Sequence, residues 1–161
     1  MSRSHERAFH LLAERMRLSA AARHGFYALL AVLAGSGAFW LLAHYEGEFV
    51  PEWQNELRRL VLEAWAMKVH GAAAFVTLIA TGAMLTNHVR RGWTLARNRA
   101  SGVSVIASLA LLTLTGYALY YVVAEATRPP VSIAHWAVGL ALAPLLAVHI
   151  VAGRRSRTPP R

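Results

Sequence analysis

Four histidines stand out in this sequence because they lie at the ends of two apolar stretches. His70 and His88 are eighteen positions apart with no charged residue between them, and His135 and His149 are fourteen positions apart in a second apolar run. At about 100° per residue, the first pair falls on one face of an α-helix, and the second pair deviates from a common face by about 40°. Each stretch can therefore present two imidazoles on one side, one toward each end of the helix.

Imidazole is a common ligand of haem iron, and one histidine from each of two helices would fill both axial positions of a haem. For helices that run in the same direction, we predict two b-type haems: His70 and His135 ligate an outer iron, and His88 and His149 ligate an inner iron. The rise between the histidines is about 27 Å in one helix and about 21 Å in the other. Tilt or a kink at Pro144 would have to absorb this mismatch.

Small residues near the histidine face would leave room for a macrocycle. The candidates that we place against the haems are Ala74, Thr77, Thr81 and Gly139. Three cations, Lys68, Arg90 and Arg91, are placed to meet haem propionates, although each also fits an ordinary cation at a membrane interface.

Two further histidines, His24 and His44, mark the ends of the first apolar stretch and are rival ligands. Twenty steps along a helix separate them by about 200°, so one straight helix cannot direct both toward the same interior. We favour an interfacial role for His44, which neighbours Tyr45. Replacement of a predicted ligand by either histidine stays open.

The elements that would position these residues are four apolar stretches, at about 24–44, 66–88, 101–124 and 132–152. Each is long enough to cross ~30 Å of hydrocarbon. Hydrophobic residues make up 56% of the chain and charged residues 16%. We therefore predict an all-α fold, an integral membrane four-helix bundle forming one domain over 23–153.

Three flanking segments complete the prediction. Residues 1–22 are expected to form a short amphipathic helix on the cytoplasmic surface, residues 51–64 an outer, periplasmic amphipathic helix, and residues 154–161 a basic disordered tail. The third apolar stretch has no histidine, so we expect it to serve packing. Ser132, after Pro129-Pro130, is the candidate cap of the fourth.

The charge distribution predicts the orientation in the membrane. Thirteen of the 17 Lys and Arg residues lie before the first stretch, between the second and third, or after the fourth, whereas the opposite loops hold four, together with six glutamates. Basic residues concentrate on the cytoplasmic side, so both termini are expected there and the second and fourth stretches run parallel. The net charge of +9 thus indicates contact with anionic lipid rather than nucleic acid.

The chain contains no cysteine. This excludes disulfides, thiolate-ligated iron–sulfur clusters, thiolate ligation of haem and covalent attachment of c-type haem through cysteine. Any haem must be held by coordination and packing.

Four segments together resemble a known family: KVHGAAAF, NHVRRGW, LTGYALYY and IAHWAVGLALAPLLAVHIVAGRR. They resemble the four-helix dihaem cytochromes b of bacteria, the group that contains cytochrome b561 and the cytochrome b subunits of hydrogenases and formate dehydrogenases. The resemblance covers about 65–155. It implies b-type haem, electron transfer across the membrane and His70, His88, His135 and His149 as ligands. Some members take a ligand from the first span, which keeps His24 and His44 as substitutes.

We therefore expect a dihaem cytochrome b of the bacterial inner membrane that carries electrons between a periplasmic or membrane redox partner and quinone or a cytoplasmic partner. Bis-histidine ligation leaves no open iron position for oxygen. The alternatives are an oxidoreductase that itself reacts with quinone or superoxide, a histidine proton relay and a membrane anchor subunit without haem. The sequence also allows a homodimer or a larger complex.

Overall fold

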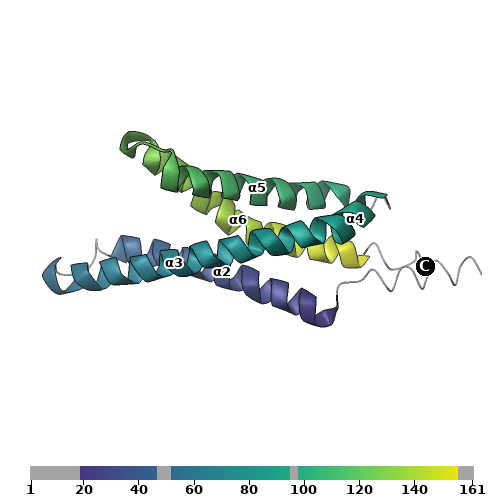
Figure 1. The fold of residues 1–161 in the computed structure, drawn as a ribbon, viewed down its shortest axis with the longest axis horizontal. Coiled ribbons are helices and arrows are strands. Elements are labelled where there is room, and N and C mark those ends of the chain that lie inside the picture. Colours follow the sequence, from purple (N-terminus) through teal and green to yellow (C-terminus); the bar gives the residue numbers. More distant parts are fainter. Residues whose placement is uncertain (1–18, 47–51, 95–97, 156–161) are drawn as a thin grey trace, which may run out of the picture. The chain divides into compact units, whose positions relative to one another are not determined.

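A computed structural model describes residues 19–46, 52–94 and 98–155. Within these ranges the chain is almost entirely helical and contains no strand. In chain order the elements are α2 (Ala20–Glu46), α3 (Glu52–Met84), the π-helix η1 (Leu85–Val89), α4 (Arg90–Thr94), α5 (Arg99–Tyr121), the 3₁₀ helix η2 (Glu125–Thr127) and α6 (Arg128–Arg155) (Figure 1). The predicted all-α fold is confirmed.

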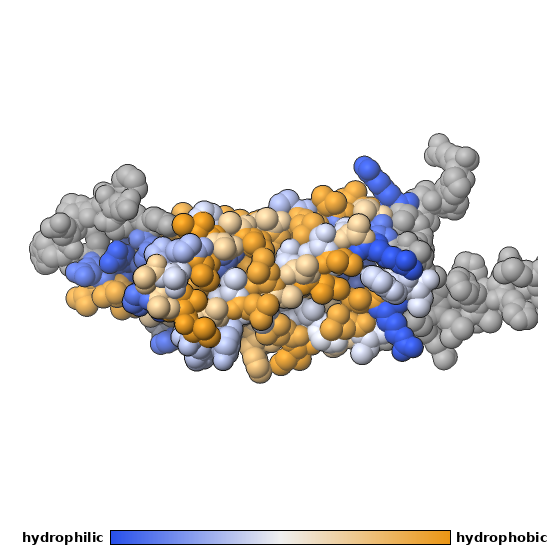
Figure 2. All heavy atoms as spheres, turned by 90° about the horizontal axis from the view of Figure 1, so that it is seen from above, coloured by the Kyte–Doolittle hydropathy of each residue, from blue (hydrophilic) through white to orange (hydrophobic). Residues whose placement is uncertain are grey.

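Four of the helical segments are long and apolar enough to cross a membrane: Ala20–His44, Glu56–Met84, Arg99–Tyr121 and Glu125–Arg155. Figure 2 shows apolar side chains along the lengths of the helices and hydrophilic side chains gathered toward helix ends. Large apolar residues such as Phe75, Leu114 and Val148 are at least 60% exposed. A water-soluble protein rarely leaves so much apolar surface uncovered, whereas a lipid bilayer covers it at no cost. The protein is a multi-pass membrane protein.

The first compact unit is a hairpin of α2 and α3. Its buried residues are small: Ala43 on α2, and Ala66, Ala73 and Thr77 on α3. The three positions on α3 are seven and four residues apart, the repeat of one helix face. Small side chains on that face allow close approach of the two backbones, as is typical of helix pairs in membranes.

The second compact unit is a hairpin of α5 and α6. Asn98 precedes α5 with a left-handed backbone at φ 49°. At the other end, the Arg128 guanidinium donates to the backbone oxygen of Leu119 over 2.9 Å, which satisfies a carbonyl in the last turn of α5. Gly139 of α6 faces Leu112 of α5. These contacts fix the antiparallel register of the two helices.

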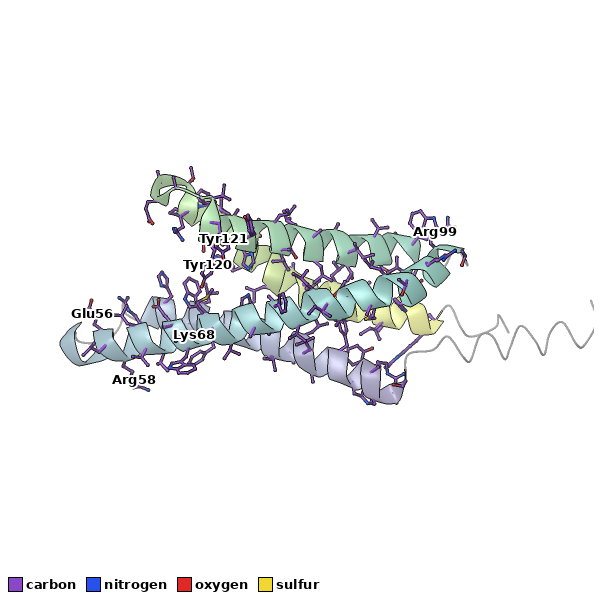
Figure 3. The ribbon with its side chains drawn as sticks, viewed as in Figure 1. Glu56, Arg58, Lys68, Arg99, Tyr120 and Tyr121 are labelled. Carbon is purple, nitrogen blue, oxygen red and sulfur yellow. The ribbon has the colours of Figure 1, made fainter. Side chains whose placement is uncertain are left out.

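Polar and aromatic residues mark the two ends of α5, as seen in Figure 3. Arg99 lies at its start, where the guanidinium donates to the backbone oxygen of Trp93 over 2.6 and 3.1 Å. Tyr117, Tyr120 and Tyr121 lie in its last turns and are at least 60% exposed. Tyrosines at this position are typical of the membrane–water interface.

One difference from the predicted elements concerns α3. We expected a separate outer helix at 51–64 and a span at 66–88, but a single α-helix runs over Glu52–Met84. Its first eighteen residues contain no proline or glycine and are rich in Glu, Leu, Arg and Ala, which favour an uninterrupted helix. The segment that we expected to be a separate helix is therefore continuous with the helix that carries His70.

A second difference concerns α6, which begins at Arg128 rather than at Ser132. Proline lacks an N–H, but the first N–H groups of a helix have no intrahelical acceptor, so Pro129 and Pro130 fit its first turn. Pro144 lies inside α6, as predicted. The predicted N-terminal helix at 1–22 lies outside the described residues except at its end, as does most of the 154–161 tail, of which Arg154 and Arg155 belong to α6.

Candidate functional site

His70 is held against α2 by its Nδ1 atom. Nδ1 lies 3.0 Å from the backbone oxygen of Leu33 and 3.2 Å from the hydroxyl oxygen of Ser36. The Ser36 hydroxyl itself donates to the same Leu33 oxygen over 3.0 Å. The imidazole is therefore fixed by two acceptors on one turn of the neighbouring helix.

His135 is held in the same way against α5. Its Nδ1 lies 2.8 Å from the hydroxyl oxygen of Thr115. That hydroxyl donates to the backbone oxygen of Leu111 over 2.7 Å, as is common for threonine in a helix. Because the Thr115 hydrogen is used in this way, its oxygen accepts from the imidazole.

His149 repeats the arrangement at the other end of the same hairpin. Its Nδ1 lies 3.0 Å from the hydroxyl oxygen of Ser101, which donates weakly to the backbone oxygen of Asn98 over 3.3 Å. In an antiparallel pair of helices, the residue numbers of any two facing residues add up to the same value. The pair Ser101 and His149 and the pair Thr115 and His135 have the same sum. The two contacts are consequences of one helix register.

These hydrogen bonds assign the tautomer of the imidazoles. A carbonyl oxygen only accepts hydrogen bonds, so Nδ1 of His70 carries a hydrogen and donates it to Leu33. The Ser101 and Thr115 hydroxyls, which donate to carbonyls, also accept from Nδ1 of their histidines. In the neutral imidazole the lone pair is then on Nε2, which is the nitrogen that would coordinate a metal.

A glycine follows each of the three hydroxyl residues and makes room for the ring. A methyl group added at Gly37 would lie 3.0 Å from Cε1 of His70, and one at Gly116 would lie 3.3 Å from Cε1 of His135. At Gly102 the distance to Cε1 of His149 would be 3.6 Å, an ordinary contact. We call these three Ser-Gly or Thr-Gly dipeptides, 36–37, 101–102 and 115–116, the hydroxyl–glycine pairs.

The hydroxyl–glycine pairs are candidate site residues that the sequence analysis did not identify. We expected the third span to serve packing, whereas α5 supplies the partners of both His135 and His149. A signal was present in the sequence, because the two pairs on α5 are fourteen positions apart, the same spacing as the two histidines on α6. Thr115 also bonds its own helix backbone.

The fourth predicted ligand, His88, differs from the others in its backbone. It lies in the π-helix η1, whereas the other three lie in α-helices. A π-helix closes i to i+5 hydrogen bonds and often marks a functional site. It also changes the azimuth of the residues after it, so the common face calculated for a straight helix from His70 to His88 does not hold unchanged.

The small residues predicted to face the haems have different surroundings. Thr77 is buried, 4% exposed, and donates to the backbone oxygen of Ala73 over 2.7 Å. The hydroxyl oxygen of Thr81 is buried and has no hydrogen-bond partner among the described residues. Ala74 is half-buried, and Gly139 lies on the side of α6 that faces α5. Their contact with a macrocycle stays a prediction.

Two of the three predicted propionate partners, Lys68 and Arg90, lie at the helix surface. The Lys68 ammonium stands 4.7 Å from the centre of the Trp65 ring, and the Lys68 side chain is exposed (Figure 3). Arg90 is exposed, and the side chain of Arg91 lies outside the described part of the chain. For Lys68 the observed partner is thus an aromatic face, which suits an interfacial cation.

The rival ligands of the first span have different environments. His44 stacks on Trp40 at 4.8 Å between ring centres, and its Nδ1 lies 3.4 Å from Oε1 of Glu63 on α3. Arg59 lies 3.7 Å from the same carboxylate. His24 is exposed near the start of α2. The contacts of His44 fit the interfacial role that we favoured for it.

Within the described ranges, no group of three or more histidine, aspartate and glutamate side chains could hold a bare metal ion. A bis-histidine haem needs two imidazoles and a macrocycle, so this result does not test it. No family model, curated protein or solved structure matches this chain. The functional interpretation therefore depends on the site itself.

Proposed function

We propose that this protein is a dihaem cytochrome b that carries electrons across a membrane between a periplasmic or membrane redox partner and quinone or a cytoplasmic partner. The observation that carries the proposal is the shared setting of His70, His135 and His149. Each has Nδ1 bonded to a hydroxyl of the neighbouring helix, and each ring faces the glycine after that hydroxyl. Metal-bound histidines in proteins are oriented in this way through the nitrogen that does not bind the metal.

The residues fit a haem group in three respects. Nδ1–H donation assigns the lone pair to Nε2, the nitrogen needed for ligation. The glycines admit the rings close to the neighbouring helix. The Thr81 hydroxyl is buried on the predicted haem-facing side without a partner among the described residues. Buried hydroxyls usually have a hydrogen-bond partner, and a group bound at this position would account for the exception. When bound, haem would supply one-electron transfer.

The helices of this chain would hold the haems and keep water away from them. In the proposal, His70 and His135 bind the outer group and His88 and His149 the inner one, while the lipid-covered helices exclude water from both. The positive-inside charge distribution supports cytoplasmic termini and the inner membrane of a bacterium. The outer part of α3, from Glu52 onward, would meet a periplasmic partner.

The proposal is tested by spectroscopy of the purified protein. We expect a reduced-minus-oxidised spectrum of b-type haem and two haems per chain by pyridine haemochrome assay. Single alanine variants at 70, 88, 135 and 149 should each lose haem. His24→Ala and His44→Ala are the matched controls and should keep both haems.

Other outcomes would change the assignment. Loss of haem in a control variant would move one ligand to the first span. A wild-type protein without haem, expressed with ample haem supply, would overturn the proposal and favour a proton relay or an anchor subunit. A second function as a quinone- or superoxide-linked oxidoreductase has no specific residue set in its support.

A further inference from the structure

We propose that Ser36, Ser101 and Thr115 are positioning residues that set the direction and the donor strength of the ligating imidazoles, and that Ser101 and Thr115 also set their tautomer. This inference depends on the proposed haem ligation. It concerns residues that do not contact the iron but act through His70, His149 and His135.

A chain of two hydrogen bonds leads from each of these three histidines to the backbone of the neighbouring helix. The imidazole N–H donates to the hydroxyl oxygen, and the hydroxyl donates to a carbonyl of its own helix. Hydrogen bonds in such a chain polarise one another. A hydroxyl whose hydrogen is engaged is therefore a stronger acceptor, and it draws the Nδ1 hydrogen away from the ring. The ring becomes more basic at Nε2 and stabilises oxidised iron over reduced iron.

The three chains differ in strength. At His135 both hydrogen bonds are short, 2.8 Å from the imidazole to Thr115 and 2.7 Å from Thr115 to Leu111. At His149 the corresponding distances are 3.0 and 3.3 Å. The acceptor effect should therefore be larger at His135 than at His149.

His70 has a second acceptor that does not depend on a side chain. If Ser36 is replaced by alanine, the backbone oxygen of Leu33 still lies 3.0 Å from Nδ1. The tautomer is then preserved. We thus expect a graded series in which Thr115→Val has the largest effect, Ser101→Ala an intermediate effect and Ser36→Ala the smallest.

Two matched controls lie on α5, the helix that carries Thr115 and Ser101. The Thr113 hydroxyl donates to the backbone oxygen of Leu109 over 2.8 Å, and the Ser104 hydroxyl donates to that of Ala100 over 3.0 Å. Both therefore use their own helix as acceptor, and both residues are exposed. Thr113→Val controls Thr115→Val, and Ser104→Ala controls Ser101→Ala.

The experiment is a redox titration of each haem, together with electron paramagnetic resonance of the oxidised protein. Thr115→Val should raise the midpoint potential of one haem and change its resonance. Thr113→Val should change neither, and Thr115→Ser should restore the wild-type values. Equal potentials and spectra for Thr115→Val and Thr113→Val would overturn the inference.

Failure of the proposed function is distinguishable from failure of this inference, because the former gives wild-type protein without haem. A folding defect of a variant is recognised by circular dichroism and by size-exclusion chromatography in detergent. If Thr115→Val fails to fold, ¹⁵N NMR of the histidine rings in wild-type protein and in Thr115→Ser gives a second test. A His135 ring with its hydrogen on Nε2 would refute the assigned tautomer.

Discussion

Replacement of Gly37 by alanine gives the sharpest test of the fit between α2 and His70. The new methyl carbon would lie 3.0 Å from Cε1 and 3.2 Å from Nδ1 of the imidazole. Carbon atoms pack best about 3.5–4.0 Å apart, so the ring or the helix must give way by a few tenths of an ångström. The same ring is fixed by Leu33 and Ser36, so it cannot move without lengthening both hydrogen bonds.

The expected cost follows from two opposing effects. Overpacking costs about 1–3 kcal/mol, and alanine in place of glycine within a helix returns roughly 0.5–1 kcal/mol. Ligand sites tolerate displacements of about 0.5 Å. Relative to an alanine at an uncrowded glycine of the same helix, which has the same gain, we therefore expect Gly37→Ala to weaken binding of the proposed outer haem by about 5- to 150-fold, the range that corresponds to about 1–3 kcal/mol.

Gly35→Ala is the control, because nothing lies within 4 Å of a methyl group at that position on the same helix. This variant should keep its haem and unfold at the same or a slightly higher temperature than the wild type. The assay is haem content per chain at limiting haem, with thermal unfolding followed in detergent. Equal haem content and equal unfolding temperature for the two variants would refute the geometry at His70.

Four further predictions follow from the same contacts. Gly116→Ala should lower haem content more than Gly102→Ala, since the added methyl group lies 3.3 Å from His135 in the first case and 3.6 Å from His149 in the second; a reversed order in the haemochrome assay would count against the hairpin register. Thr81→Val should leave the unfolding temperature of the haem-free protein unchanged or raise it, because a buried hydroxyl without a partner costs about 1–3 kcal/mol, and a marked drop in unfolding temperature would show that the hydroxyl does have a partner. The chain has no cysteine, so single substitutions Glu125→Cys and Arg155→Cys report topology directly; an impermeant thiol reagent should label the first and not the second in intact cells with a permeable outer membrane, and the opposite result would invert the orientation. The two hairpins, produced as separate chains cut between 94 and 98, should bind haem only when they are present together, and haem bound by one hairpin alone would contradict the proposed pairing of the ligands.

The four membrane helices could be predicted from the sequence because their signal is local. A long uncharged run must be helical in lipid, and α2 and α5 begin and end within four residues of the predicted spans. The irregular turns and the exact helix ends were harder to predict. The residue types around His88 do not indicate a π-helix. Pro129 and Pro130 suggested a loop before α6, but they fit its first turn.

The candidate site was only half predictable for a related reason. The histidines are identified by type and spacing along one helix, whereas Ser36, Ser101 and Thr115 are identified only when the register between two helices is known. A serine in a membrane helix usually bonds its own backbone, as Ser104 does. A glycine directly follows each of the three hydroxyls, but Gly82 also follows Thr81, whose hydroxyl has no partner among the described residues, so this local pattern does not identify the histidine partners by itself.

The pairing of hydroxyl and histidine within a single hairpin bears on the biogenesis of the protein. Each of the three contacts joins the first helix of a hairpin to the second, so each hairpin can orient these imidazoles as soon as it has entered the membrane. The first hairpin leaves the ribosome before the second has been made. In the proposed function, the cofactors would then join two halves in which His70, His135 and His149 already have fixed directions. Maturation would then need no search for the ligand geometry at these three histidines.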